Sequence, residues 1–142
     1  MDYARYTMPT RRLSLSKKKT TARSTAKTCP SEHIEQRTFV EWWRKTQPDD
    51  LFAIPNAGKR SKAARGRLLV EGMTAGVWDL YAPARFMWIE FKRREVGALS
   101  QAQKDFGTAR LEEGYQCIVA WGCDDAIAQL QSGIRASWKR PK

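Results

Sequence analysis

The chain has 142 residues, 42% of them hydrophobic, and its 26 basic and 15 acidic side chains give a net charge of +11 at pH 7. This size favours one domain with a tail, and the absence of an apolar stretch approaching about 18 residues excludes a membrane-spanning helix. Three cysteines without a Cys-x-x-Cys pair give neither a disulfide framework nor a zinc site, and no hydrophobic N-terminal segment indicates secretion. We therefore expect a cytoplasmic protein in a reducing compartment, with an acidic partner.

The N-terminal segment, residues 1–30, is the most basic part of the chain. It carries eight lysines and arginines and one aspartate, a net charge of +7, whereas residues 31–142 carry +4. Low hydrophobicity with high charge predicts a disordered arm, in which Lys17, Lys18 and Lys19 are candidates to contact nucleic-acid phosphates. The same Arg- and Ser-rich, acid-poor composition occurs in transit peptides, which is the alternative interpretation of this arm.

A first helix is expected to begin at Ser31, a favourable N-cap, with Glu32 and Glu35 in its first turn, where carboxylates favour the helix dipole. Its apolar stripe ends before a Pro-Asp-Asp turn, and a short strand is expected over residues 51–55. His33 is the only histidine, so it lacks partners for a metal site and is expected at the surface or the core edge.

A basic segment follows this strand. Residues 56–60 are expected to form a loop, and residues 68–70 to end a helical turn before a glycine. The lysines and arginines of this segment can form a solvated face, but their clustering favours contact with phosphates. The candidates for this contact are Lys59, Arg60, Lys62, Arg65 and Arg67.

Two strands joined by a Pro-Ala turn are expected over residues 77–82 and 86–92, and the short connection makes them antiparallel. Residues two apart on a strand share a face, so Glu90 and Lys92 point the same way, and Asp79 from the neighbouring strand can join them. Alternating charges usually mark a solvated face. Here the apolar surroundings and the second carboxylate favour a site where a hard divalent cation and an ammonium act on a phosphodiester.

The last third of the chain contains a capping-box pattern, Ser100 with Gln103, which predicts a helix that ends at a glycine after Glu113. A buried strand over residues 115–121 follows, parallel to the strand before the helix. Asp124 is expected to cap a last helix, and residues 134–142 to form a basic tail. The order α-β-β-β-α-β-α predicts a small α/β domain over residues 31–133, with a mixed central sheet flanked by helices.

Several of these motifs, in this order, resemble the VRR-NUC domain family of the PD-(D/E)xK nuclease superfamily over about residues 31–131. The matching motifs are Glu32-x-x-x-Gln36, Pro55-Asn56, Gly72-Met73-x-x-Gly76-x-x-Asp79, Ile89-Glu90-Phe91-Lys92, Leu99-Ser100-x-x-Gln103 and Gly114-Tyr115. The chain departs from the family at Trp78, where the family usually has proline. We expect this change to be tolerated, since proline there would mainly set the backbone shape before the strand.

The resemblance implies a restriction-endonuclease-like core and a metal-dependent nuclease. Carried over residue by residue, Asp79, Glu90 and the main-chain carbonyl of Phe91 would bind Mg²⁺, with Mn²⁺ as a substitute. Glu32 would complete the metal site from the first helix, and Glu35, one turn on, is the alternative.

The resemblance also implies the catalytic roles. Lys92 would orient or activate the attacking water and stabilise charge on the phosphoryl group, and Gln103 would support the lysine or a phosphate at the edge of the site. The single-domain size resembles stand-alone phage and bacterial members, which implies the cytoplasm of a bacterial or phage-infected cell. Such members are associated with cleavage of branched DNA as homodimers.

Two main classes of function follow. The first is a Mg²⁺-dependent endodeoxyribonuclease that selects branched DNA such as four-way junctions, with no small-molecule cofactor and no membrane partner. The alternative is a non-catalytic DNA-binding protein that retains the fold, and a weaker third interpretation is an RNA-associated basic protein. Two carboxylates would repel a phosphate unless a metal lay between them, so the acidic pair favours the nuclease.

Overall fold

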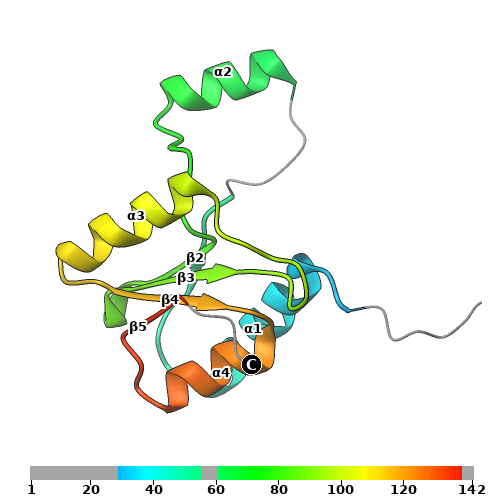
Figure 1. The fold of residues 1–142 in the computed structure, drawn as a ribbon, viewed down its shortest axis with the longest axis vertical. Helices are drawn as coiled ribbons and strands as arrows, with labels where there is room; N and C mark the ends of the chain where they lie inside the picture. The colour runs from blue at the N-terminus through cyan, green and yellow to red at the C-terminus, as the bar shows by residue number, and fades with distance from the viewer. Residues whose placement is uncertain (1–28, 56–60, 139–142) are drawn as a thin grey trace, which may run out of the picture.

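The computed structural model describes residues 29–55 and 61–138 (Figure 1). Its helices are α1 (Glu32–Thr46), α2 (Lys62–Val70), α3 (Gln101–Glu112) and α4 (Cys123–Gln131), with a short 3₁₀ helix, η1 (Pro83–Arg85). Its strands are β1 (Phe52–Ala53), β2 (Leu80–Ala82), β3 (Met87–Phe91), β4 (Gln116–Ala120) and β5 (Ala136–Ser137). Within these two segments, no helix is both long and apolar enough to cross a membrane.

The strands form one mixed sheet in the order β1-β2-β3-β4-β5. β1 with β2 and β2 with β3 are antiparallel, whereas β3 with β4 and β4 with β5 are parallel. Figure 1 shows α3 over one face of the sheet and α1 and α4 on the other. The predicted α/β class, the hairpin of β2 and β3, and the parallel pairing of β3 with β4 through α3 are therefore confirmed.

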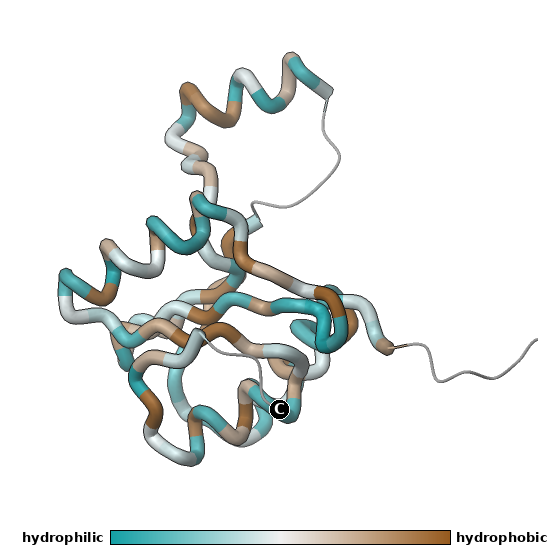
Figure 2. Tube along the Cα trace, viewed as in Figure 1, coloured by the Kyte–Doolittle hydropathy of each residue, from teal (hydrophilic) through white to brown (hydrophobic). Residues whose placement is uncertain are grey.

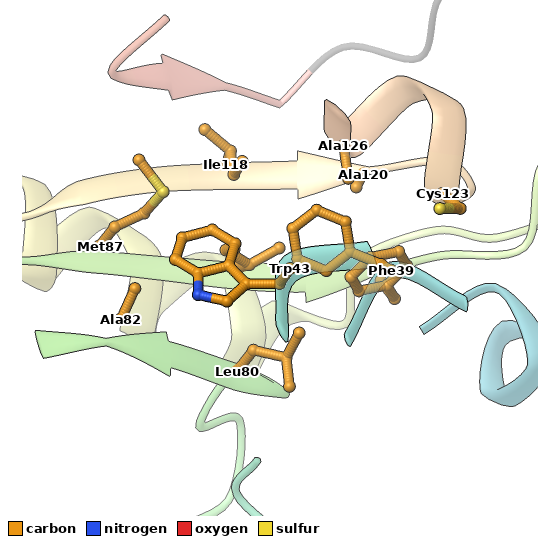
Figure 3. Packing of buried hydrophobic residues seen from close by; sticks show 11 residues of the cluster. Phe39, Trp43, Leu80, Ala82, Met87, Ile118, Ala120, Cys123 and Ala126 are labelled. Carbon is orange, nitrogen blue, oxygen red and sulfur yellow. The ribbon is translucent and has the colours of Figure 1, made fainter. Parts of the chain in front are cut away.

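The sheet face under α1 and α4 carries the larger of the two clusters of buried hydrophobic side chains (Figure 3). Phe39 and Trp43 of α1 are at most 1% exposed and pack with Leu80 of β2, Ile89 of β3 and Ile118 of β4. Burial of side chains this large is the main source of stability for a domain of this size. This cluster fixes the hairpin that carries the candidate site against α1.

The opposite sheet face, under α3, forms a second cluster around Trp78, Cys117, Val119 and Trp121. Alternate residues of β3 and β4 supply the two clusters, as the two-residue period of a strand requires. Cys117 is fully buried there, and burial raises the pKa of its thiol to about 12. It is therefore a small apolar core residue rather than a reactive thiol.

The C-terminal segment differs from the prediction, because the expected tail of residues 134–142 contains strand β5. Cys117 pairs with Ala136 and Ile118 pairs with Ser137, so β5 extends the sheet beside β4. A two-residue strand at a sheet edge has no hydrophobic period of its own. It exists because β4 offers unpaired backbone groups, which sequence patterns do not reveal.

The start of α4 also differs, since its N-cap is Gly122 and not Asp124. Gly122 has a φ of 104°, a backbone conformation that favours glycine, and the side chain of Arg94 occupies the space a Cβ would need. Asp124 lies in the first turn instead, where it forms an ion pair with Arg94 at 3.2 Å. The close approach of Arg94 therefore selects the residue at the cap.

Candidate active site

The acidic pair is built by the hairpin of β2 and β3. Leu80 pairs with Ile89, so Asp79, just before β2, lies across from Glu90 of β3. Oδ2 of Asp79 accepts a hydrogen bond from the backbone N–H of Phe91 at 2.8 Å, which fixes the carboxylate beside β3. The structure thus brings the two predicted carboxylates together on the sheet face that α3 covers.

Glu90 and Lys92 share this face and are both buried. Glu90 is 1% exposed and Lys92 is 7% exposed, and Nζ of Lys92 lies 2.6 Å from Oε1 of Glu90. Nε2 of Gln103 on α3 donates to the same Oε1. Oε2 of Glu90 is buried and has no hydrogen-bond partner in the part of the chain that the structure describes. Such an unsatisfied buried oxygen is an available ligand position.

The pair is electrostatically costly without a cation. Burial, followed by the nearby Asp79 charge, raises the pKa of Glu90 to about 8, against the opposing influence of Lys92. Burial is also the main cause that raises the pKa of Asp79, with the Glu32 charge as a smaller contribution in the same direction. When both are ionised, the buried Glu90 and the half-buried Asp79 beside one lysine carry an excess negative charge, which a divalent cation would neutralise.

The oxygen donors fit a hard cation such as Mg²⁺, because the chemistry of the group is carboxylate and carbonyl only. Within residues 29–55 and 61–138, no group of three or more His, Cys, Asp or Glu side chains is placed to hold a metal. The fit therefore rests on the carboxylates of Asp79 and Glu90, and the main-chain carbonyl of Phe91 stays the third donor that the family resemblance implies. Mg²⁺ accepts such a site, since it keeps several of its waters.

The two glutamates of α1 occupy different places. Glu32 is exposed, and its Oε1 accepts from the backbone N–H of Arg93 at 2.9 Å, so it lies beside the strand end that carries the acidic pair. Glu35 is buried and accepts from Arg94 at 2.7 Å and from the backbone N–H of Cys123 at 2.8 Å. Of the two alternatives, Glu32 is the one near Asp79, and Glu35 joins three segments of the fold.

Gln103 forms the predicted capping box, and its side chain also contacts Glu90 rather than Lys92. Its backbone N–H donates to Oγ of Ser100 at 3.2 Å, and its Oε1 accepts from the backbone N–H of Ser100 at 3.0 Å, so the predicted capping box is present. Its remaining amide donor reaches Glu90. The cap fixes the side chain in a single orientation, and that orientation supports the acidic pair.

Trp78, at the position where the family that the motifs resemble usually has proline, links the site to α3. Its side chain is fully buried, and its Nε1 donates to the main-chain oxygen of Gln103 at 2.9 Å. It also packs beside Phe106 and Trp138. The segment that carries Asp79 is thereby tied to the helix that carries Gln103, a connection that no local sequence pattern predicts.

This packing requires Gly107, in the interior of α3. A Cβ there would lie 2.7 Å from Cζ2 of Trp138 and closer still to Cζ2 of Trp78. We expect Gly107→Ala to destabilise the fold by about 1–3 kcal/mol, because overpacking outweighs the better helix propensity of alanine. Urea unfolding monitored by tryptophan fluorescence measures the change.

Gly66 is the matched control for this substitution, because it also lies inside a helix, α2, and has no atom within 4 Å of its ideal Cβ. Gly66→Ala should be neutral or stabilise by roughly 0.5–1 kcal/mol. Equal effects of the two substitutions would contradict the close packing around Gly107.

Of the residues predicted to contact phosphates, the structure describes three. Lys62, Arg65 and Arg67 are exposed on α2, a nine-residue helix where the sequence predicted only a final helical turn. Figure 1 shows α2 standing apart from the sheet, and Figure 2 shows its hydrophilic residues followed by a hydrophobic C-terminal end. The other candidates lie outside the described residues; they are Lys17, Lys18, Lys19, Lys59 and Arg60.

Comparison with known proteins establishes the class of fold. No family model matches the sequence, and no curated protein shows significant sequence similarity to it. A solved structure described as a VRR_NUC domain protein is similar, with a TM-score of 0.56 over 80% of this chain and 98% of that chain, at 20% sequence identity. This similarity confirms the predicted restriction-endonuclease-like α/β fold and agrees with the resemblance in the motifs.

Proposed function

We propose that the protein is a Mg²⁺-dependent endodeoxyribonuclease. One observation carries the proposal: Asp79 and Glu90 lie together on one sheet face, Glu90 buried and Asp79 half-buried, with the ammonium of Lys92 at 2.6 Å from Glu90. A fold shared with a VRR_NUC domain protein supports it. Two carboxylates beside a fixed positive charge are suited to a metal-assisted hydrolysis of a phosphodiester.

The residues would divide the work as follows. Asp79, Glu90 and the Phe91 carbonyl would hold Mg²⁺, with Glu32 at the edge, and the bound ion would supply Lewis acidity to the phosphoryl oxygens and lower the pKa of a bound water. Lys92 would donate to the attacking water or to the phosphate. Its stem is buried, so its ammonium is held in place before substrate arrives.

The alternative, a DNA-binding protein without catalysis, explains the acidic pair less well. Withdrawing two neighbouring carboxylates from solvent, Glu90 almost fully and Asp79 in part, costs free energy, which is why the pKa of each is raised. A surface that only binds phosphates would gain nothing from these carboxylates, since they repel phosphate when no metal is bound. In a metal-dependent nuclease the same two carboxylates would hold the cation, and the bound cation would offset their lost solvation.

Cleavage is expected to require Mg²⁺ or Mn²⁺ and to stop when the metal is removed, since an oxygen-only site suits hard cations. The test incubates the full chain with linear, nicked, flapped and four-way DNA, in Mg²⁺, Mn²⁺, Ca²⁺ or EDTA. Ca²⁺ should support binding without cleavage, because its looser coordination places water poorly. Undiminished cleavage in EDTA would overturn the proposal.

We further propose that the protein acts as a homodimer on branched DNA. One site of this size cuts one strand, and a four-way junction needs two cuts related by two-fold symmetry, which a symmetric dimer supplies. Preference for the four-way substrate in the same panel, with sedimentation at micromolar concentration, measures both properties. A monomer that cleaves linear and four-way DNA equally would remove this part and leave the nuclease.

A further inference from the structure

A row of aromatic side chains crosses the sheet next to the acidic pair. We call Phe52, Tyr81, Trp88, Tyr115 and Phe86 the aromatic row. The ring centroids of Tyr81 and Trp88 are 4.5 Å apart, those of Tyr81 and Tyr115 are 6.2 Å apart, and those of Phe86 and Tyr115 are 6.1 Å apart. Phe52 of β1 is the register partner of Tyr81, so directly opposite side chains extend the row to the sheet edge.

The row lies on the same sheet face as the candidate active site. Trp88 precedes Glu90 by two residues on β3, and Tyr81 follows Asp79 by two residues along the chain into β2. Residues two apart on a strand share a face and are separated by about 6.7 Å. The cross-strand pair of Tyr81 and Trp88 is therefore the immediate neighbour of the pair of Asp79 and Glu90.

Some rings of the aromatic row are held by packing against α3, and others are exposed to solvent. Trp88 is held by an edge-to-face contact with Phe106 of α3, at 4.9 Å and 86°, and both Trp88 and Tyr115 pack against the cluster under α3. Phe52 is 52% exposed and Phe86 is 63% exposed. Neither phenylalanine belongs to a buried cluster, so the fold gains little from an aromatic ring at either place.

The backbone conformation of Phe86 is the strongest indication that the exposed rings contact a ligand. Phe86 ends η1 with a φ of 48°, in the left-handed region, and it is the one non-glycine residue with positive φ in the described part of the chain. Glycine or asparagine adopts this conformation at lower cost than a bulky side chain. A strained, solvent-exposed phenylalanine at the far end of a row that leads to the candidate active site therefore points to contact with a ligand.

We propose that the aromatic row binds unpaired nucleobases of the DNA strand whose phosphate lies at Asp79 and Glu90. This proposal rests on the proposed nuclease function and specifies its substrate. Bases stack on aromatic rings with little regard to sequence, but only when they are not already stacked within a duplex. The row would therefore favour a single-stranded segment next to the scissile phosphate, as occurs at flaps and at branch points.

The test compares two fluorescent 12-nucleotide DNA strands, oligothymidylate and a strand of abasic nucleotides, which carry the same phosphates. Binding of the full chain is measured by anisotropy in EDTA, so that neither strand is cut. Wild type should bind the base-bearing strand about tenfold tighter or more, the effect of at least one stacked base. Phe86→Asn and Tyr81→Leu should each remove most of this preference and leave binding of the abasic strand unchanged.

Controls separate stacking from folding. Phe86→Asn should have a thermal midpoint equal to or above that of wild type, because asparagine tolerates positive φ. Ile134→Asn changes an exposed apolar residue, 40% exposed, next to the opposite sheet edge, and should leave the preference for bases intact. Should Phe86→Asn fold poorly, Tyr81→Leu decides alone.

Three outcomes would overturn the proposal. Wild type could bind both strands equally, the variants could weaken both strands equally, or the variants could dissociate a dimer without changing the preference, which would assign the row to an interface between copies. Metal-dependent cleavage by a protein with no preference for bases leaves the nuclease function standing. A preference for bases in a protein that never cleaves DNA would instead remove the nuclease function.

Discussion

Asp79→Asn, Glu90→Gln and Lys92→Ala should each lower metal-dependent DNA cleavage by at least about 10²–10³-fold, because each removes a preorganised charge from the reacting phosphate. DNA binding in EDTA should survive, since the acidic pair does not attract phosphate without a metal. Gel assays of strand cleavage and anisotropy of the same DNA measure the two properties separately. Near wild-type cleavage by any two of the variants would refute the assignment of the site.

Glu90→Gln should lose activity without losing stability. The folded protein raises the pKa of Glu90 from 4.5 to about 8, so the ionised carboxylate progressively destabilises the metal-free fold as pH rises through this range. Glutamine resembles the protonated acid, and Asp79 still faces the Lys92 charge. At pH 8 without metal, the thermal midpoint of Glu90→Gln should therefore equal or exceed that of wild type.

Lys104→Ala provides the control for Lys92→Ala, because Lys104 is an exposed lysine on α3, the helix that covers the site. It should cleave DNA as wild type does. If both lysine variants lost activity equally, general loss of positive charge rather than the buried ammonium would explain the effect.

The parts of the site that the sequence predicted are those with a local signature. Alternation along β3 placed Glu90 and Lys92 on one face, and the Ser100 and Gln103 pattern marked the start of α3, because these signals depend on residues only two or three positions apart. The short turn between β2 and β3 likewise required antiparallel pairing, which brought Asp79 across from Glu90.

The parts that the sequence did not predict depend on distant contacts. The two-residue strand β5 forms only because β4 is there to pair with it. Gly122 begins α4 because Arg94, from the segment after β3, occupies the space beside it. From the sequence, Gly107 is only a residue of low helix propensity, whereas in the structure its missing side chain leaves space for Trp78. Each of these features depends on close packing between residues far apart in the chain, which the spacing of residues along the sequence does not reveal.

The connection made by Glu35 is of the same kind and should have a large effect on stability. Its buried carboxylate, on α1, accepts from Arg94 at 2.7 and 3.2 Å and from the backbone N–H of Cys123, the first residue of α4, at 2.8 Å. Glu35→Gln leaves Arg94 with only its ion pair to the exposed Asp124, at 3.2 Å, and should cost about 2–3 kcal/mol, less than for a fully buried pair because Arg94 is partly exposed. Urea unfolding at pH 7 measures the loss.

The effect should depend on pH with a definite sign. The hydrogen bond from Arg94 is the main cause that lowers the pKa of Glu35 below its ordinary value of 4.5, so its contribution is fully present above that pH and is lost as pH falls through the folded value. The difference in unfolding free energy between wild type and Glu35→Gln should therefore shrink below pH 4.5. Glu41→Gln, which breaks an exposed ion pair with Arg37 at 3.7 Å, should cost under about 0.5 kcal/mol. If Glu35→Gln were as mild as Glu41→Gln at pH 7, the carboxylate would not be what joins α1, α4 and the segment that follows Lys92.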